Sequence, residues 1–155
     1  SFEFTCPLRF CALSLNLMFP RAELLYTRCY CEENIYQLCR WVKATKENVL
    51  GDLTVVFISN PLRRIPIWEQ SSSVEGNFLI WDYHVILVHF KDEVDESLVY
   101  DFDTRLAFPT PIKKYVWLSF RPDLLLNEQF ERYFRLIPAK DFLSHFASDR
   151  SHMVC

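Results

Sequence analysis

Glycine is scarce in this chain of 155 residues, which contains only two. A phosphate-binding loop needs several glycines within a short stretch, so nucleotide-binding proteins of that kind are excluded. Seventeen Lys and Arg stand against 20 Asp and Glu, and the net charge of -3 gives no positive field for nucleic acid or an acidic membrane. We therefore expect neither a nucleic-acid partner nor a membrane partner.

A long hydrophobic run is also absent. The most apolar stretch near the N-terminus covers residues 8–19, which is shorter than the about 20 residues that a membrane-spanning helix needs. Glu3 precedes this stretch and Arg9 interrupts it, and neither fits a signal peptide. These features predict a soluble, intracellular protein.

The six cysteines do not form a pattern that requires disulfides or metal. Half of the residues are apolar, so the chain can fold around a core without disulfides, and we expect reduced thiols. Cys29 and Cys31 are one residue apart, and no second Cys/His pair follows at zinc-finger spacing. The sequence therefore predicts no metal site and no cofactor.

One amphipathic helix is predicted from residue 32 onward. Its apolar stripe, at i, i+3, i+4 and i+7, consists of Ile35, Leu38, Cys39 and Val42. Glu32 and Glu33 fall in the first turn, where acidic side chains complement the helix dipole. Cys31 then lies at the helix N-terminus, a position that stabilises a thiolate, whereas Cys39 is predicted to be a core residue.

The rest of the chain predicts a single α+β domain with a mainly antiparallel sheet. Strands are predicted at 53–59, 65–68, 78–90, 98–104 and 115–120, and further helices at 127–135 and 141–147. Residues 1–27 have no clear period, and they form either a poorly ordered leader or a segment that packs on the domain in its own way.

His84 and an aspartate are predicted to meet on two paired strands. Alternation along 78–90 points His84 and His89 to opposite faces. If 78–90 and 98–104 form a hairpin with a loop at 91–94, His84 lies opposite Asp101, whereas a loop at 92–95 places Asp103 there instead. Strand pairing alone leaves both aspartates open.

Cys31, His84 and one of these aspartates have the chemistry of a cysteine hydrolase. A thiolate needs a histidine to shuttle protons, and a carboxylate orients the imidazole, as in papain-like or transglutaminase-like enzymes. Taken singly, a Cys-x-Cys, a strand histidine and an Asp-x-Asp are each more often structural. His145 and His152 lie in polar segments and are predicted to be surface groups.

Several uncommon strings occur in one order along the chain: CYCEEN (29–34), VFISN (56–60), IPIW (65–68), WDYHV (81–85), YDFDT (100–104) and FASDRSHM (146–153). On these strings the chain resembles the N-terminal glutamine amidohydrolases over roughly residues 28–153. The resemblance implies that Cys31, and not Cys29, is the nucleophile, that His84 and Asp101 complete a catalytic triad, and that Asp103 is at most a supporting residue. It also implies a divergent leader at 1–27 and a catalytic domain at 28–155 that is shortened at its C-terminus.

The implied reaction converts N-terminal glutamine of a protein or peptide into glutamate, releases ammonia and feeds the N-degron degradation pathway. Selectivity for a free α-amino group suggests an acidic partner, and Glu33 and Asp82 are the candidates. We expect a monomer in the cytoplasm and the nucleus, without a cofactor. The alternatives are another papain-like cysteine peptidase or acyl transferase, and a catalytically impaired shortened form.

Overall fold

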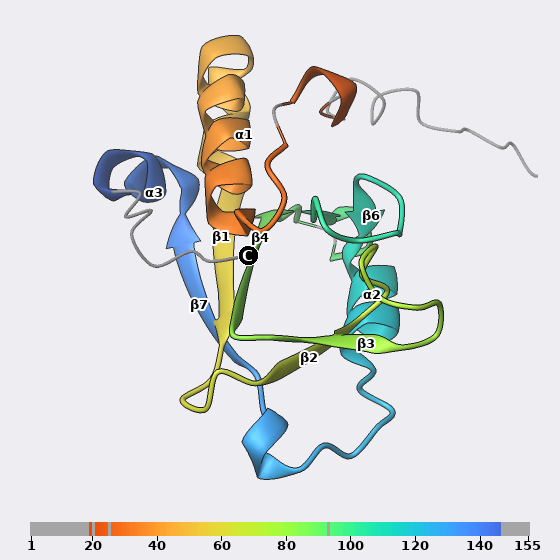
Figure 1. Cartoon of the computed structure of the whole chain (residues 1–155). Helices are drawn as coiled ribbons and strands as arrows, with labels where there is room; N and C mark the ends of the chain where they lie inside the picture. The colour runs from red at the N-terminus through yellow and green to blue at the C-terminus, as the bar shows by residue number, and fades with distance from the viewer. Residues whose placement is uncertain (1–18, 20, 25, 93, 147–155) are drawn as a thin grey trace, which may run out of the picture.

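A five-stranded antiparallel sheet forms the centre of the computed structural model, which describes residues 19, 21–24, 26–92 and 94–146 (Figure 1). Its strand order is β6-β5-β4-β1-β7, and β2 and β3 form a separate two-stranded sheet. The strands are β1 (Leu53–Ser59), β2 (Ile65–Trp68), β3 (Phe78–Trp81), β4 (Tyr83–His89), β5 (Leu98–Tyr100), β6 (Thr110–Pro111) and β7 (Tyr133–Pro138). The helices are α1 (Cys31–Thr45), α2 (Ile112–Tyr115) and α3 (Ala139–His145). The predicted α+β class with a mainly antiparallel sheet is confirmed.

The helix α1 begins at Cys31, as predicted, and packs along the sheet (Figure 1). Its apolar stripe is fully buried, and burial raises the pKa of the Cys39 thiol to about 12. Cys39 is therefore a core residue, as its spacing indicated. In the part of the chain that the structure describes, none of the helices has the length and apolar character of a membrane span.

Strand alternation separates two apolar cores, one on each face of the sheet. Val55 and Leu87 belong to the core under α1 and α3, whereas Val56 and Ile86 belong to the core that includes Tyr115 of α2. Neighbouring residues of β1 and β4 thus point to opposite faces, because side chains alternate along a strand.

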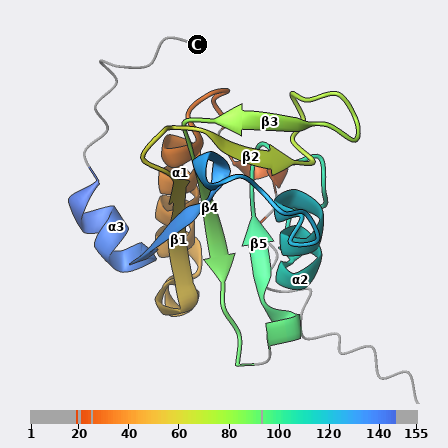
Figure 2. The same ribbon diagram turned by 90° about the horizontal axis from the view of Figure 1, so that it is seen from below.

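The predicted strand 78–90 is wrong in one respect, because the chain breaks at Asp82. β3 pairs with β2, and β4 pairs with β1, so the two halves belong to different sheets. Figures 1 and 2 show the β2–β3 ribbon lying across one end of the large sheet. The predicted strands at 53–59 and 65–68 are confirmed as β1 and β2.

The hairpin between β4 and β5 is confirmed, but its register is not the one that places His84 opposite Asp101. Leu87 pairs with Tyr100 and His89 pairs with Leu98, which is the alternative register. If this ladder continued, His84 would lie opposite Asp103. β5 is shorter than predicted and ends at Tyr100, so the ladder stops before it reaches His84.

Two further predictions are wrong, and one helix is confirmed. Residues 115–120 are helical, since α2 is followed by the π-helical turn η5 (Val116–Phe120), and a short apolar run does not distinguish strand from helix. Residues 127–135 form the 3₁₀ turn η6 (Glu128–Phe130) and the start of β7, because pairing with β1 overrides the helical spacing. The helix predicted at 141–147 is α3; residue 147 lies outside the described residues.

The remaining short turns are 3₁₀ segments: η2 (Arg21–Glu23), η3 (Glu47–Asp52) and η4 (Val94–Glu96). The described residues before α1 contact the domain. Phe19 is buried and stacks on Tyr100 with ring centroids 4.7 Å apart, and the guanidinium of Arg21 donates to the carbonyl of Phe102 at 2.6 Å.

Candidate active site

Cys31 is the first residue of α1, and its thiol is free and 4% exposed. The start of the helix is fixed by two hydrogen bonds between Thr27 and Asn34. The backbone N–H of Thr27 donates to Asn34 Oδ1 at 2.7 Å, and Asn34 Nδ2 donates to the Thr27 carbonyl at 2.8 Å. The N–H groups of the first turn have no intrahelical acceptor, so the sulfur lies at the positive end of the helix dipole.

His84 lies in β4, fully buried, near the end where the two-stranded sheet crosses. Its Nε2 is 2.9 Å from Asp101 Oδ1, so in the neutral ring this nitrogen carries the proton and donates it. The indole of Trp81 packs against the imidazole with ring centroids 4.7 Å apart. The ring is therefore held on its edge by a carboxylate and on its face by an aromatic side chain.

Asp101 accepts four hydrogen bonds, although it follows β5 in an irregular segment. Oδ1 also accepts from the backbone N–H of Asp103 at 2.9 Å. Oδ2 accepts from the hydroxyl of Tyr115 at 2.7 Å and from Gln70 Nε2 at 3.3 Å. These donors fix both oxygens of a carboxylate that is 1% exposed.

The His84–Asp101 pair is held in its charged form. Burial alone lowers the pKa of His84, but Asp101 and then Cys31 outweigh it, and the pKa of His84 is raised well above its usual range. Burial alone raises the pKa of Asp101, but His84, Tyr115 and the Asp103 N–H outweigh it, and that pKa is lowered. Each residue of the pair thus favours the charged form of the other.

The charges of Cys31 and Asp103 also act on the imidazole. Nδ1, the nitrogen not bonded to Asp101, has no hydrogen-bond partner among the described residues. A proton on Nδ1 is thus free to pass to a group that reacts at the thiol. This arrangement can perform nucleophilic acyl chemistry, with the thiol as nucleophile and the imidazole as acid and base.

The structure brings His84 into contact with Asp101, Cys31 acts on the pKa of the same imidazole, and Asp103 lies beside the pair. Glu33 is half-buried in the first turn of α1, and Asp82 is exposed at the break between β3 and β4. Cys29 is half-buried and has a positive φ of 68° in the turn before the helix. His145 is exposed, as predicted, and His152 lies outside the described residues.

Sequence reasoning missed Gln70 and Tyr115, the two side chains that bind Asp101 Oδ2. Gln70 follows β2 and forms an isolated β-bridge with Thr104, and Tyr115 lies in a segment predicted to be a strand. Both become neighbours of Asp101 only through tertiary packing, and no local pattern identifies them. In the structure, both side chains are buried and direct a polar group at Asp101.

One group of side chains has the composition of a cation site. A ring nitrogen of His84 and carboxylate oxygens of Asp101 and Asp103 lie within 4.8 Å of one another. Asp101 already accepts four hydrogen bonds, and the Nε2 of His84 is committed to it. A cation would have to break these bonds, so the group fits a hydrogen-bonded pair better than a metal centre.

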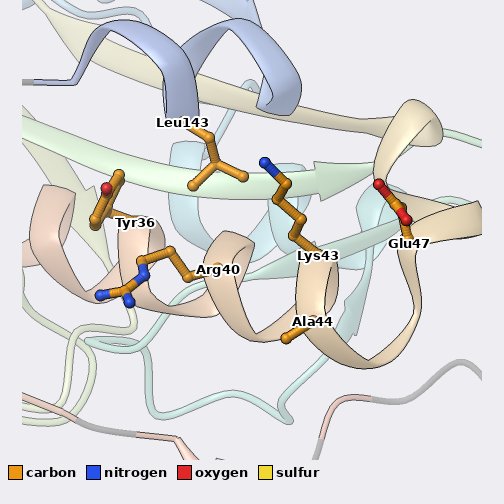
Figure 3. A pocket seen from close by; sticks show the side chains of 6 residues that line it. All are labelled: Tyr36, Arg40, Lys43, Ala44, Glu47 and Leu143. Carbon is orange, nitrogen blue, oxygen red and sulfur yellow. The ribbon is translucent and has the colours of Figure 1, made fainter.

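A groove on the outer side of α1 is separate from this site. It lies between α1, α3 and the turn after α1, and Figure 3 shows the side chains that line it. They are Tyr36, Arg40, Lys43, Ala44, Glu47 and Leu143. None of the three candidate catalytic residues lines this groove.

The fold is an α+β domain, and it carries a candidate cysteine hydrolase site. In that site a thiol at a helix start acts on a histidine that is hydrogen-bonded to a buried carboxylate. The model of a protein family described as N-terminal glutamine amidase matches residues 26–155. A protein N-terminal glutamine amidohydrolase from Drosophila grimshawi is 44% identical over 143 residues, which are 91% of this chain and 69% of that protein. One from Bos taurus is 46% identical over 134 residues, which are 86% of this chain and 64% of that protein. The chain therefore belongs to the N-terminal glutamine amidase family, and the predicted resemblance is confirmed.

Proposed function

We propose that this chain hydrolyses the side-chain amide of an N-terminal glutamine, with Cys31, His84 and Asp101 as its catalytic triad. The observation that carries the proposal is the 2.9 Å contact between His84 and Asp101, in a pair whose protonation also depends on Cys31. The relatives named for the same activity supply the substrate class. The substrate is a protein or peptide with a free N-terminal glutamine.

The proposed reaction has two halves. The Cys31 thiolate attacks the carboxamide carbon, and the carbon–nitrogen bond breaks as His84 gives its proton to the departing nitrogen, which leaves as ammonia. Water then attacks the thioester while His84 accepts its proton, and the sulfur leaves as thiolate. The product is N-terminal glutamate, and both residues return to their starting states.

The backbone at the start of α1 is suited to the developing negative charge. The N–H of Cys31 precedes the first intrahelical hydrogen bond, which runs from Asn34 to the carbonyl of Tyr30. An oxyanion on the attacked carbon is stabilised by such an N–H and by the helix dipole. We therefore extend the proposal to a papain-like arrangement, in which a helix start supplies the nucleophile and neighbouring strands supply its partners.

The family resemblance also suggests the setting of the reaction. N-terminal glutamate is a destabilising residue for the N-degron pathway, and we propose that this chain feeds that pathway as a monomer in the cytoplasm and the nucleus. Gel filtration coupled to light scattering measures the assembly state directly. A dimer at low micromolar concentration would contradict this part of the proposal.

The substrate is tested with three peptides that differ only at their first residue: Gln, Asn and N-acetyl-Gln. We expect ammonia from the free N-terminal Gln peptide alone, measured with a coupled glutamate dehydrogenase assay. Cleavage of a backbone bond would support a papain-like peptidase instead. A folded protein that acts on none of the peptides would support an inactive form.

The nucleophile is tested with two matched variants. We expect Cys31→Ala to abolish ammonia release, because no other group replaces the sulfur. Cys29→Ala removes a thiol two residues away and is expected to retain turnover. Equal activity in the two variants would contradict the assignment of Cys31, and a thermal melt of each variant checks that it is folded.

A further inference from the structure

Asp103 is a buried carboxylate that the triad does not use. It is 6% exposed, and its Oδ1 accepts a hydrogen bond from the hydroxyl of Tyr26 at 2.8 Å. Its Oδ2 is sealed from solvent and has no hydrogen-bond partner among the described residues. A buried charged oxygen without a donor is costly, so such an atom indicates that a donor is supplied from outside the chain.

The position of this carboxylate fits one part of the substrate. An Asp103 oxygen lies within 4.8 Å of a ring nitrogen of His84, the residue that must reach the departing amide nitrogen. In glutamine, four single bonds separate the α-nitrogen from the carboxamide carbon, which gives a reach of about 5 Å. With the carboxamide between Cys31 and His84, the α-ammonium group therefore reaches the neighbourhood of Asp103.

The charged form of Asp103 is disfavoured unless a further cation approaches it. Burial raises the pKa of its carboxyl, His84 lowers it, Asp101 raises it, and the Tyr26 hydroxyl and Arg21 lower it, with the result that the pKa stays above its usual range. The guanidinium of Arg21 donates to the Phe102 carbonyl at 2.6 Å and lies over the Phe108 ring. An ammonium group at Oδ2 would supply both the missing donor and the missing charge.

We propose that Asp103 binds the α-ammonium group of the substrate and thereby selects glutamine at a free N-terminus. This proposal rests on the proposed function and adds the residue that reads the free amine. Tyr26, which is 45% exposed, donates to Asp103 Oδ1, and the proposal requires that side chain to move when the substrate binds.

The two acidic residues expected from the sequence are weaker candidates. Asp82 is exposed, where water screens a charge pair and reduces its contribution to binding. Glu33 is half-buried, and it interacts with other groups of the protein. Of the three carboxylates, Asp103 combines burial with an oxygen for which the described part of the chain supplies no partner.

The proposal is tested with two peptides that share one carboxamide. The first begins with Gln, and the second begins with its desamino analogue, a glutaramoyl group, which lacks only the α-nitrogen. The wild-type chain is expected to favour the Gln peptide about ten- to hundredfold in kcat/KM. Asp103→Asn is expected to lose this preference, mainly through a higher KM for the Gln peptide, with little change for the desamino peptide. Asp92→Asn, at an exposed position, removes the same charge and is the matched control.

Each result is decisive. Equal losses for both peptides in Asp103→Asn would mean that Asp103 only positions Asp101, and they would overturn the proposal. A wild-type chain that does not prefer the Gln peptide would overturn the proposal even if the variant does not fold. A preference for the Gln peptide that survives in Asp103→Asn but is lost in Glu33→Gln or Asp82→Asn would also overturn it. Two measurements distinguish failure of the proposed function from failure of the amine site. Absence of ammonia release by the wild type refutes the function. Equal dissociation constants of the two peptides for Cys31→Ala refute the amine site.

Discussion

Replacement of Tyr115 by phenylalanine isolates one hydrogen bond of the buried carboxylate. The hydroxyl of Tyr115 donates to Asp101 Oδ2 at 2.7 Å, and the other bond to that oxygen, from Gln70, is longer at 3.3 Å. Tyr115→Phe therefore removes the shorter of the two donors and leaves the ring in place. Tyr115 and Asp101 are 0% and 1% exposed, so water does not replace the lost donor.

A hydrogen bond to a charged group contributes about 1.5–3 kcal/mol, and we expect Tyr115→Phe to lower the free energy of unfolding by this amount at neutral pH. The loss should shrink in acid. Asp101 has a lowered pKa in the folded state, so its contribution to stability is present above the unfolded value of about 3.9 and is lost as the pH falls through the folded value. Turnover should also fall, because Asp101 holds His84.

Urea denaturation followed by circular dichroism, at neutral pH and at pH values below about 4, measures both effects. Tyr133→Phe is the matched control, because Tyr133 is 55% exposed. If the two variants lose the same free energy at neutral pH, the hydrogen bond does not stabilise Asp101 in the way inferred from its geometry. A loss that does not depend on pH would refute the coupling to the charge of Asp101.

Two further variants test other buried polar groups. Both ring nitrogens of His89 lack a partner among the described residues, and burial lowers the pKa of this imidazole. Folding therefore favours the neutral ring, and stability is lost as the pH falls through the unfolded value of about 6.5. His89→Leu should reduce this loss, and thermal melts with the same pH dependence in the variant and the wild type would contradict the prediction. Asn60 Nδ2 donates to the carbonyls of Gln129 and Glu131, each at 3.0 Å, so Asn60→Ala should cost about 1–3 kcal/mol in urea denaturation, while Asn77→Ala at an exposed position should cost little.

The sequence predicted the elements whose local pattern agrees with their tertiary surroundings. The stripe of α1 faces the sheet, so helical spacing and burial coincide, and β1 is buried on both faces and reads as a continuous apolar run. β7 differs because it is an edge strand whose residues are mostly exposed. Its Phe134 therefore fits a helical spacing with Phe130 as well as it fits a strand, and only pairing with β1 decides between them.

The candidate site divides in the same way. Cys31 was predicted because a helix start changes the chemistry of a thiol, and His84 was predicted because strand alternation separates it from His89. Gln70 and Tyr115 hold Asp101 from segments 31 and 14 residues away, and no period in the sequence connects them to it. Predicting them requires knowing where the chain turns, which depends on the packing of the whole domain.

The choice between Asp101 and Asp103 shows why the correct partner of His84 did not follow from strand pairing. The observed register points toward Asp103, yet the ladder ends at Tyr100, and the chain beyond it is free to bring Asp101 to the imidazole. The next turn then places the N–H of Asp103 on the same Asp101 oxygen and leaves the Asp103 carboxylate beside the pair. A strand that ended three residues later would keep Asp103 in the ladder opposite His84 and would leave no second carboxylate for the substrate amine. The early end of β5 therefore supplies both the carboxylate that holds the histidine and the one that we propose selects the N-terminus.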